Sequence, residues 1–177
     1  MIPAYAIVFD SNGNGTGSHK WMDAKTVVLA KNEIACTEAQ AQNPSAWQVV
    51  NGVLVESLPA AQATQKALLQ SAFQKAEQSP ISIALASGVT TSFGMTPHDW
   101  TKIVGLYSKY VAKGVTVPSG YQIPDASGVL QAITVADIEN LFDAGETQMT
   151  GAISKLASLI GQVESATTVS AVQSIAW

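Results

Sequence analysis

The residues from Asp10 to Gly15 have types and spacing that can bind a calcium ion. Asp10, Asn12 and Asn14 alternate with other residues and Gly15 follows, which is how an EF-hand calcium loop begins. Such a loop ends with a bidentate glutamate at its twelfth position, where this chain has Trp21, and no second loop is nearby. The two Asn-Gly steps also suit turns with positive φ without any ion. A polar hairpin turn is the preferred interpretation, and calcium binding stays open.

Other side chains that commonly bind metals are few and widely separated. Histidine occurs only as His19 and His98, and cysteine only as Cys36. Zinc sites need three or four ligands, usually in closely spaced pairs, and these three residues lack that spacing. We therefore expect no metal site. Cys36 has no partner for a disulfide within the chain and is interpreted as a small apolar filler.

The chain also lacks a recognisable catalytic arrangement. His98 and Asp99 can be combined on paper with one of many serines, but no Gly-x-Ser-x-Gly nucleophile elbow accompanies them. The Gly-x-Gly-x-Gly run that starts at Gly13 is not followed by a helical pattern, so it fails as a nucleotide-binding fingerprint. We expect no catalytic residues, no cofactor and no enzymatic activity.

The composition excludes further classes of function. Among 177 residues there are 13 acids and nine lysines but no arginine, giving a net charge of −4. Because arginine is the preferred contact for phosphate and guanine, nucleic-acid binding is not expected, and anionic membrane surfaces are disfavoured for the same reason. No apolar run reaches the roughly 18 residues that span a bilayer. Nor does the start resemble a secretory signal, which favours folding in a reducing cytoplasm.

A low charge content points to contacts with other proteins. Only 12% of residues are charged, whereas 47% are hydrophobic. This is enough for a core, and it leaves a surface of neutral polar side chains that suits close packing against a partner.

Residues 1–57 predict a small, mostly β module. Residues 5–10 are β-rich and residues 16–22 return as a partner strand after the turn, with residues 26–30 as a third strand candidate. Thr37 and Gln40 fit a capping box that opens a helix. Residues 47–55 then form a hairpin pattern around Asn-Gly.

Residues 58–79 predict a connecting helix, and residues 80–177 an α+β domain of hairpins and three helices. The expected hairpins lie at residues 81–95 and 120–130. Thr96, with Pro97 and Asp99, predicts the start of a helix that Gly114 ends. A final short helix is expected from Thr168. The predicted fold class is α+β, with one long helix.

That long helix carries the predicted partner-binding residues. Thr134 is the expected cap, with Asp137 three residues later, and the helix should run to about Ser165. Its apolar or small positions recur in steps of four and three, which is the repeat of a coiled-coil seam. The seam either packs inside its own domain or binds a partner chain. We predict partner contacts at Ile138, Phe142, Met149, Leu156, Leu159, Val163 and Trp177.

Two further features of this region have simple interpretations. Glu139, Asp143 and Glu146 recur at helical spacing and are expected to form a solvated acidic face. A terminal tryptophan frays unless it is docked, so Trp177 either packs on its own domain or anchors a partner.

The stretch from Gly88 to Trp177 resembles a domain of uncharacterised function found in proteins of tailed bacteriophages and prophages. Genes for such proteins typically lie beside tail-fibre genes, and their products are often labelled tail-fibre or tail-fibre-assembly proteins. The motifs that carry the resemblance are the helix start at residues 95–100, the turn at residues 123–128, the cap at residues 133–134 and the closing residues 175–177. The N-terminal part of the chain, at residues 5–13 and 47–55, is similar to the N-terminal sequences of phage fibre-associated proteins.

This resemblance implies a role in virion assembly or architecture. The expected function is that of a non-catalytic tail protein, made in the host bacterial cytoplasm and associated with tail-fibre or baseplate proteins in the virion. The alternatives are an assembly chaperone absent from the mature virion, a receptor-binding module that contacts host glycans through exposed aromatic side chains, and a small hydrolase. The oligomeric state stays open, a homo-oligomer included.

Overall fold

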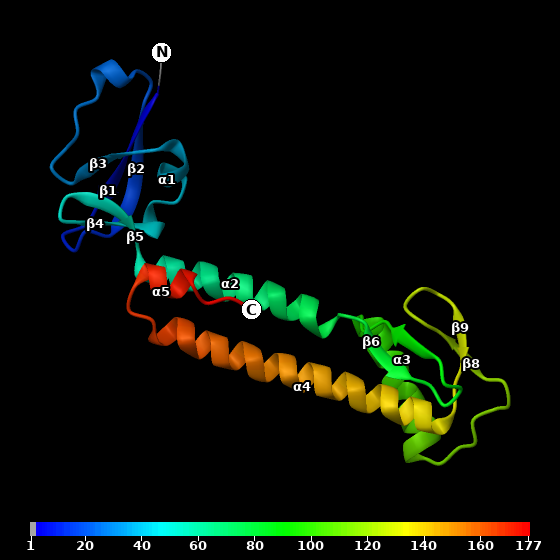
Figure 1. The fold of residues 1–177 in the computed structure, drawn as a ribbon. Coiled ribbons are helices and arrows are strands. Elements are labelled where there is room, and N and C mark those ends of the chain that lie inside the picture. Colours follow the sequence, from blue (N-terminus) through cyan, green and yellow to red (C-terminus); the bar gives the residue numbers. More distant parts are fainter. Residues whose placement is uncertain (1–2) are drawn as a thin grey trace. The chain divides into compact units, whose positions relative to one another are not determined.

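The computed structural model describes residues 3–177, which form two compact units. Of the described residues, one unit contains 3–68 and 159–176, and the other contains 69–158 with Trp177. The units group the chain differently from the boundaries expected at residues 57 and 79, because the long helices α2 (Leu58–Glu77) and α4 (Val135–Ser165) each contribute residues to both. The element order is shown in Figure 1.

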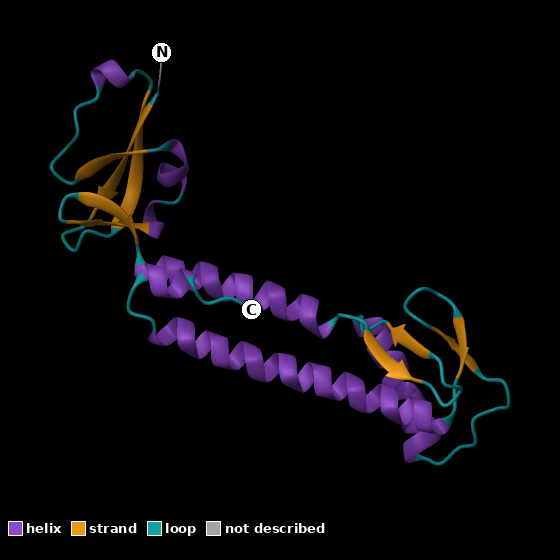
Figure 2. Ribbon diagram, viewed as in Figure 1, coloured by secondary structure: helices purple, strands orange, loops and turns teal. Residues whose placement is uncertain are grey.

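The α+β prediction is confirmed. Helices alternate with short antiparallel strands, which pair locally in small sheets (Figure 2). In the first unit, β1 (Ala4–Phe9) lies between β2 (Gly15–Trp21) and β3 (Glu33–Cys36). Ala6 and Ile7 on the central strand are fully buried.

The strand predicted at residues 26–30 is wrong. A 3-10 turn, η1 (Ala24–Thr26), occupies its start and residues 27–30 are a loop in which Val28 and Leu29 are exposed. The third strand is β3, a few residues later. The buried Glu33 side chain accepts a hydrogen bond from the Ala30 N–H at 2.8 Å and pairs with His19 on β2. These contacts fix the turn that brings β3 into register with β1, and apolar composition alone does not reveal them.

The other predicted elements of this unit are confirmed. Thr37 and Gln40 form the capping box of α1 (Glu38–Gln42), which is followed by a 3-10 turn, η2 (Pro44–Ala46). The hairpin of β4 (Trp47–Val50) and β5 (Val53–Glu56) turns at Asn51-Gly52, both with positive φ, as a type I′ turn requires.

Polar bonds join the helical part of the first unit. The Gln62 side-chain amide donates to the Val163 carbonyl at 3.0 Å, near the end of α4, and Lys66 pairs with Glu164 at 2.7 Å. The short helix α5 (Val169–Gln173), capped by Thr168 as predicted, buries Val172 completely.

The second unit packs two hairpins and a capped helix against the start of α4. Its strands are β6 (Ile81–Ala84), β7 (Thr90–Phe93), β8 (Gln122–Pro124) and β9 (Leu130–Ala132). The helix α3 (Pro97–Leu106) begins at the Thr96 cap and continues as a π-helical segment, η3 (Tyr107–Ala112). The buried core of this unit contains Ile81, Ile83, Leu85, Phe93, Met95, Ile103, Tyr110, Ile133, Ile138 and Leu141.

Three aromatic rings stack where α3 meets α4. The Phe142 ring lies between Tyr107, with centroids 3.9 Å apart, and Trp100, with centroids 5.4 Å apart. Gly145 is buried beneath the Trp100 ring, and a Cβ atom there would lie 2.4 Å from it. The lack of a side chain at Gly145 therefore allows α3 and α4 to pack closely.

We expect Gly145→Ala to destabilise the second unit by about 1–3 kcal/mol, because Trp100 must shift, and this outweighs the gain of about 1 kcal/mol in helix propensity. Gly151→Ala is the matched control: it lies on the same helix with no atom within 4 Å of a built Cβ, and should stabilise the chain slightly. Urea unfolding of both variants measures the difference. An equal effect of the two substitutions would contradict the packing of Trp100 on Gly145.

Candidate functional site

A cleft of about 770 Å³ lies in the second unit. One wall is the helix α3–η3, and another is formed by the β8–β9 hairpin. Its apolar lining includes Phe93, Ile103, Leu106, Ile123 and Leu141, whereas its polar lining includes Asp99, Lys102, Lys109, Tyr110 and Asp125. The cleft thus combines an apolar surface with charged groups.

The capped start of α3 positions one side of the cleft. The Thr96 hydroxyl donates to the Asp99 carboxylate at 2.6 Å and accepts from the Asp99 N–H at 3.3 Å. A Cβ at Gly94 would lie 2.6 Å from the Asp99 carboxylate, so the glycine leaves room for this cap. Asp99 is therefore committed to holding the helix start.

The other wall is organised by Asp125 at the β8–β9 turn. Its carboxylate accepts hydrogen bonds from the side chains of Ser127, Thr91 and Gln131 and from the N–H groups of Ser127 and Val129, at 2.7–3.0 Å. These bonds, the Ser127 hydroxyl first, hold the pKa of Asp125 far below its usual value despite some desolvation. The Ala126 N–H also donates to the Ser92 carbonyl at 2.7 Å, which ties the hairpin to β7.

We expect Asp125→Asn to loosen this hairpin, since an amide keeps one acceptor oxygen where the carboxylate has two. Hydrogen exchange at the Ser127 and Val129 amides should become faster, while exchange in α4 stays unchanged. Unchanged exchange at the turn would show that the carboxylate does not hold it.

The acidic groups of the cleft have partners within the chain, and the lysines do not. Both carboxylates have internal donors, whereas within residues 3–177 neither Lys102 nor Lys109 has an acidic partner. Lys109 Nζ lies 4.8 Å from the centre of the Tyr110 ring. The helical wall therefore presents two unpaired ammonium groups.

Tyr110 is the buried polar residue of the site. Only 4% of its surface is exposed, and its ring lies 5.7 Å from that of Tyr121. Its hydroxyl has no hydrogen-bond partner in the described part of the chain. Every unpartnered side-chain oxygen or nitrogen of the buried residues there is accessible to solvent, and the Tyr110 hydroxyl is therefore accessible as well. The hydroxyl consequently opens onto a hollow.

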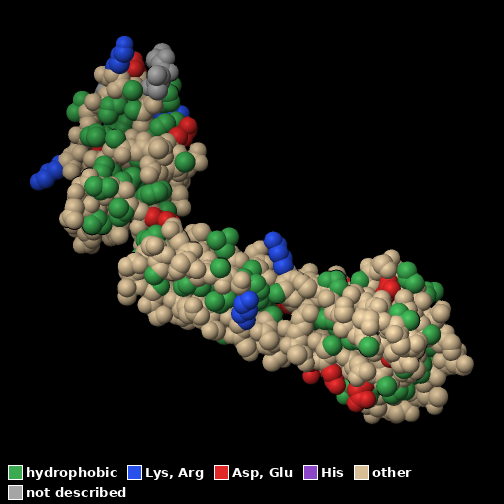
Figure 3. Space-filling view, in the orientation of Figure 1, with side chains coloured by type: hydrophobic (Ala, Val, Ile, Leu, Met, Phe, Trp, Pro, Cys, Tyr) green, Lys and Arg blue, Asp and Glu red, His purple; other side chains and the backbone are tan. Residues whose placement is uncertain are grey.

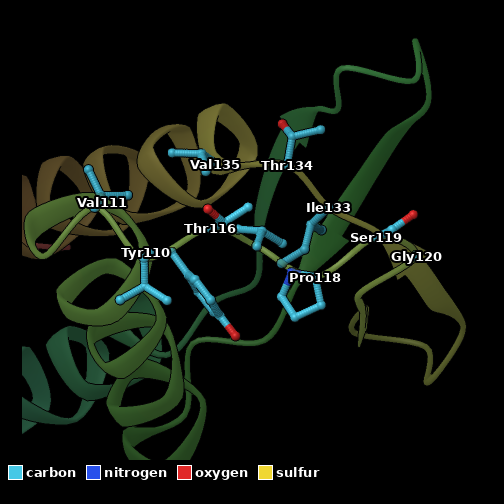
Figure 4. Close-up of a pocket in the computed structure, with 12 residues that line it drawn as sticks. Tyr110, Val111, Thr116, Pro118, Ser119, Gly120, Ile133, Thr134 and Val135 are labelled. Carbon is cyan, nitrogen blue, oxygen red and sulfur yellow. The ribbon is translucent and has the colours of Figure 1, made fainter.

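Tyr110 also borders a second hollow of about 660 Å³ (Figure 4). Its lining is mostly apolar and comes from Val111, the loop of residues 114–120 and the start of α4 at residues 133–135. It contains no ionisable group other than Tyr110. The charged groups thus belong to the first cleft alone.

The predicted partner-binding residues do not line this cleft. Ile138 and Val163 have no exposed surface, so they cannot touch a partner in this conformation. Phe142 and Met149 are half-buried against the core, and Leu156 and Leu159 are half-buried as well. The seam is largely used for packing within the chain, and partner binding at its half-buried positions stays a prediction.

Trp177 is docked on its own unit. Its ring meets Phe73 edge-on, with centroids 6.3 Å apart, and Lys155 Nζ lies 4.8 Å from its centre. The packing role expected for this tryptophan is observed, and a partner contact at its half-buried ring stays a prediction.

At the calcium-like turn, backbone N–H groups donate hydrogen bonds to the Asp10 carboxylate. Asp10 accepts from the N–H groups of Asn12 and Asn14 at 2.8 and 2.9 Å. These bonds, the one from Asn14 first, hold the pKa of Asp10 below its usual value. A Cβ at Gly15 would lie 1.9 Å from the Pro44 carbonyl oxygen, so the turn packs directly against backbone. The arrangement explains the Asn and Gly residues without an ion.

The remaining candidate residues are not brought together. Among residues 3–177, no group of three or more His, Cys, Asp or Glu side chains is placed to hold a metal ion. His98 is exposed, His19 pairs with Glu33, and burial raises the pKa of the Cys36 thiol, which disfavours the reactive thiolate.

The surface is neutral for the most part, as its composition predicts. Figure 3 shows scattered charged side chains among apolar and uncharged ones. Among the aromatic side chains of residues 3–177, Phe93 and Tyr110 are buried and the others are half-buried. Glycan binding through their accessible parts stays a prediction. None of the helices described within residues 3–177 has the length and apolar character to cross a membrane.

Comparison with protein-family models, with curated proteins and with solved structures finds no match to this chain.

Proposed function

We propose that this chain is a non-catalytic tail protein of a tailed bacteriophage or prophage, associated with the tail fibre or baseplate, and that it binds a partner chain in the cleft between α3 and the β8–β9 hairpin. One observation carries the proposal. The two central motifs of the resemblance, at residues 95–100 and 123–128, supply residues to the two walls of that cleft.

These motifs are far apart in the sequence and consist mainly of caps and turns. Met95, Thr96 and Asp99 come from the first motif, and Ile123, Asp125 and Ala126 from the second. Such residues can serve folding alone. Their meeting at a cleft that has unpaired donors supports a binding role, because a purely structural cap needs no open cleft beside it.

Mass spectrometry of purified phage particles tests the role. We expect peptides from this chain in mature particles, at a fixed ratio to tail proteins. Absence from particles, together with co-purification with the fibre protein from infected cells, would identify an assembly chaperone. Absence from both would overturn the proposal.

A further inference from the structure

We propose that the partner enters the cleft with a segment that combines carboxylates and apolar side chains. This inference rests on the proposed function, which states that a partner binds there, and adds the chemistry of the bound segment.

The donors of the helical wall define this chemistry. Lys102, Lys109 and Tyr110 line the cleft from α3–η3, and their ammonium and hydroxyl groups lack acceptors in the described chain. Tyr110 also lines the second hollow. Lys102 and Lys109 are seven residues apart, which is about 10 Å along a helix. Two carboxylates of one peptide segment can reach both ammonium groups. Charge-assisted bonds of this kind are the stronger hydrogen bonds of proteins.

The carboxylates of the cleft do not supply these acceptors. Asp99 is engaged by Thr96, and Asp125 accepts from five donor groups, four of its own hairpin and the Thr91 hydroxyl on β7. A basic partner segment would find both already occupied. The groups of the cleft that still lack partners are donors, so the bound segment should supply acceptors.

The floor of the cleft adds an apolar requirement. Phe93, Ile103 and Leu141 lie almost fully buried at its base, and the half-buried side chains of Leu106, Tyr121 and Ile123 form its accessible apolar surface. A segment that leaves this floor in contact with water gains little from binding, so an apolar side chain between the acidic residues should bury it. With a volume of about 770 Å³, the cleft has the size of a site for a few residues.

Selection from a random library of bead-displayed 12-residue peptides tests the inference. We expect enriched peptides to place Asp or Glu beside Leu, Ile or Phe, and their binding to weaken as salt is raised. The double variant Lys102→Gln/Lys109→Gln should bind them at least about tenfold more weakly. Lys75→Gln, outside the cleft, is the matched control and should bind normally.

A second pair of variants isolates the hydroxyl. Tyr110→Phe keeps the buried ring and should weaken binding by about threefold to tenfold. Tyr107→Phe, which lies outside the cleft on the same helical wall, should have no effect. Enrichment of basic or uncharged peptides, no enrichment at all, or binding insensitive to the lysines would overturn the inference. The proposed function would survive such a result if the chain is found in particles.

Discussion

Gly15→Ala is expected to destabilise the first unit by about 3 kcal/mol or more, one of the two largest effects that the structure implies. A Cβ at this position would lie 1.9 Å from the Pro44 carbonyl oxygen and 2.8 Å from its carbon. Both are backbone atoms, so no side chain can rotate away. The segment of η2 and β4 would have to separate from the β1–β2 turn, which exposes this part of the unit to water.

Gly17→Ala provides the control. It lies on the same strand, β2, two residues further along, and no atom comes within 4 Å of a built Cβ. Its stability should change by no more than about 0.5 kcal/mol. Denaturant unfolding gives the two free energies, and hydrogen exchange of the β1 and β4 amides locates the loss. Equal stability of the two variants would show that the turn does not pack on Pro44.

Asp137→Ala is expected to cost the second unit about 2–4 kcal/mol. The carboxylate is 2% exposed and accepts from the Thr134 N–H, the Thr134 hydroxyl and the Ala86 N–H, at 2.7–2.8 Å. It therefore caps α4 and also holds the turn of the β6–β7 hairpin. Removing it leaves the Thr134 and Ala86 N–H groups without this acceptor. Asp143→Ala, on the exposed face of the same helix, should have little effect.

The same carboxylate makes stability depend on pH. Burial raises the pKa of Asp137, but the hydrogen bonds from Thr134 and Ala86 outweigh this and leave the pKa below its ordinary value. A carboxyl group with a depressed folded pKa stabilises the chain above its unfolded pKa, near 4, and loses that contribution as the pH falls below it. Unfolding between pH 6 and 3 should therefore be less pH-dependent in Asp137→Asn than in the unsubstituted chain. Parallel curves would contradict this assignment.

Local chemistry made most elements predictable. The capping boxes at Thr37 and Thr134, the Asn51-Gly52 turn and the Pro97 helix start each satisfy backbone groups within a few residues. Their structures therefore follow from short sequence patterns. The strand β3 was missed because the His19–Glu33 pair and the pairing with β1 that position it join residues on different strands.

The cleft could not be predicted from sequence patterns either, because its walls come from segments that are far apart in the chain. Lys102 and Lys109 share a helical face, but nothing in their spacing shows that the Asp125 turn lies opposite them. The long-helix seam was visible, yet the pattern does not say whether a partner or the chain itself covers it. Tertiary packing decided this: Ile138 lies in the core of its own unit and Val163 is fully buried.

Photocrosslinking in phage-producing cells tests the central claim, that a tail protein binds in this cleft. A photoreactive amino acid replaces Gln122, an exposed residue of the cleft wall, or Ser154, an exposed residue of α4 outside the cleft. We predict a covalent adduct with a tail-fibre or baseplate protein from position 122 and none from position 154. Adducts from both positions alike, or none from position 122, would contradict it.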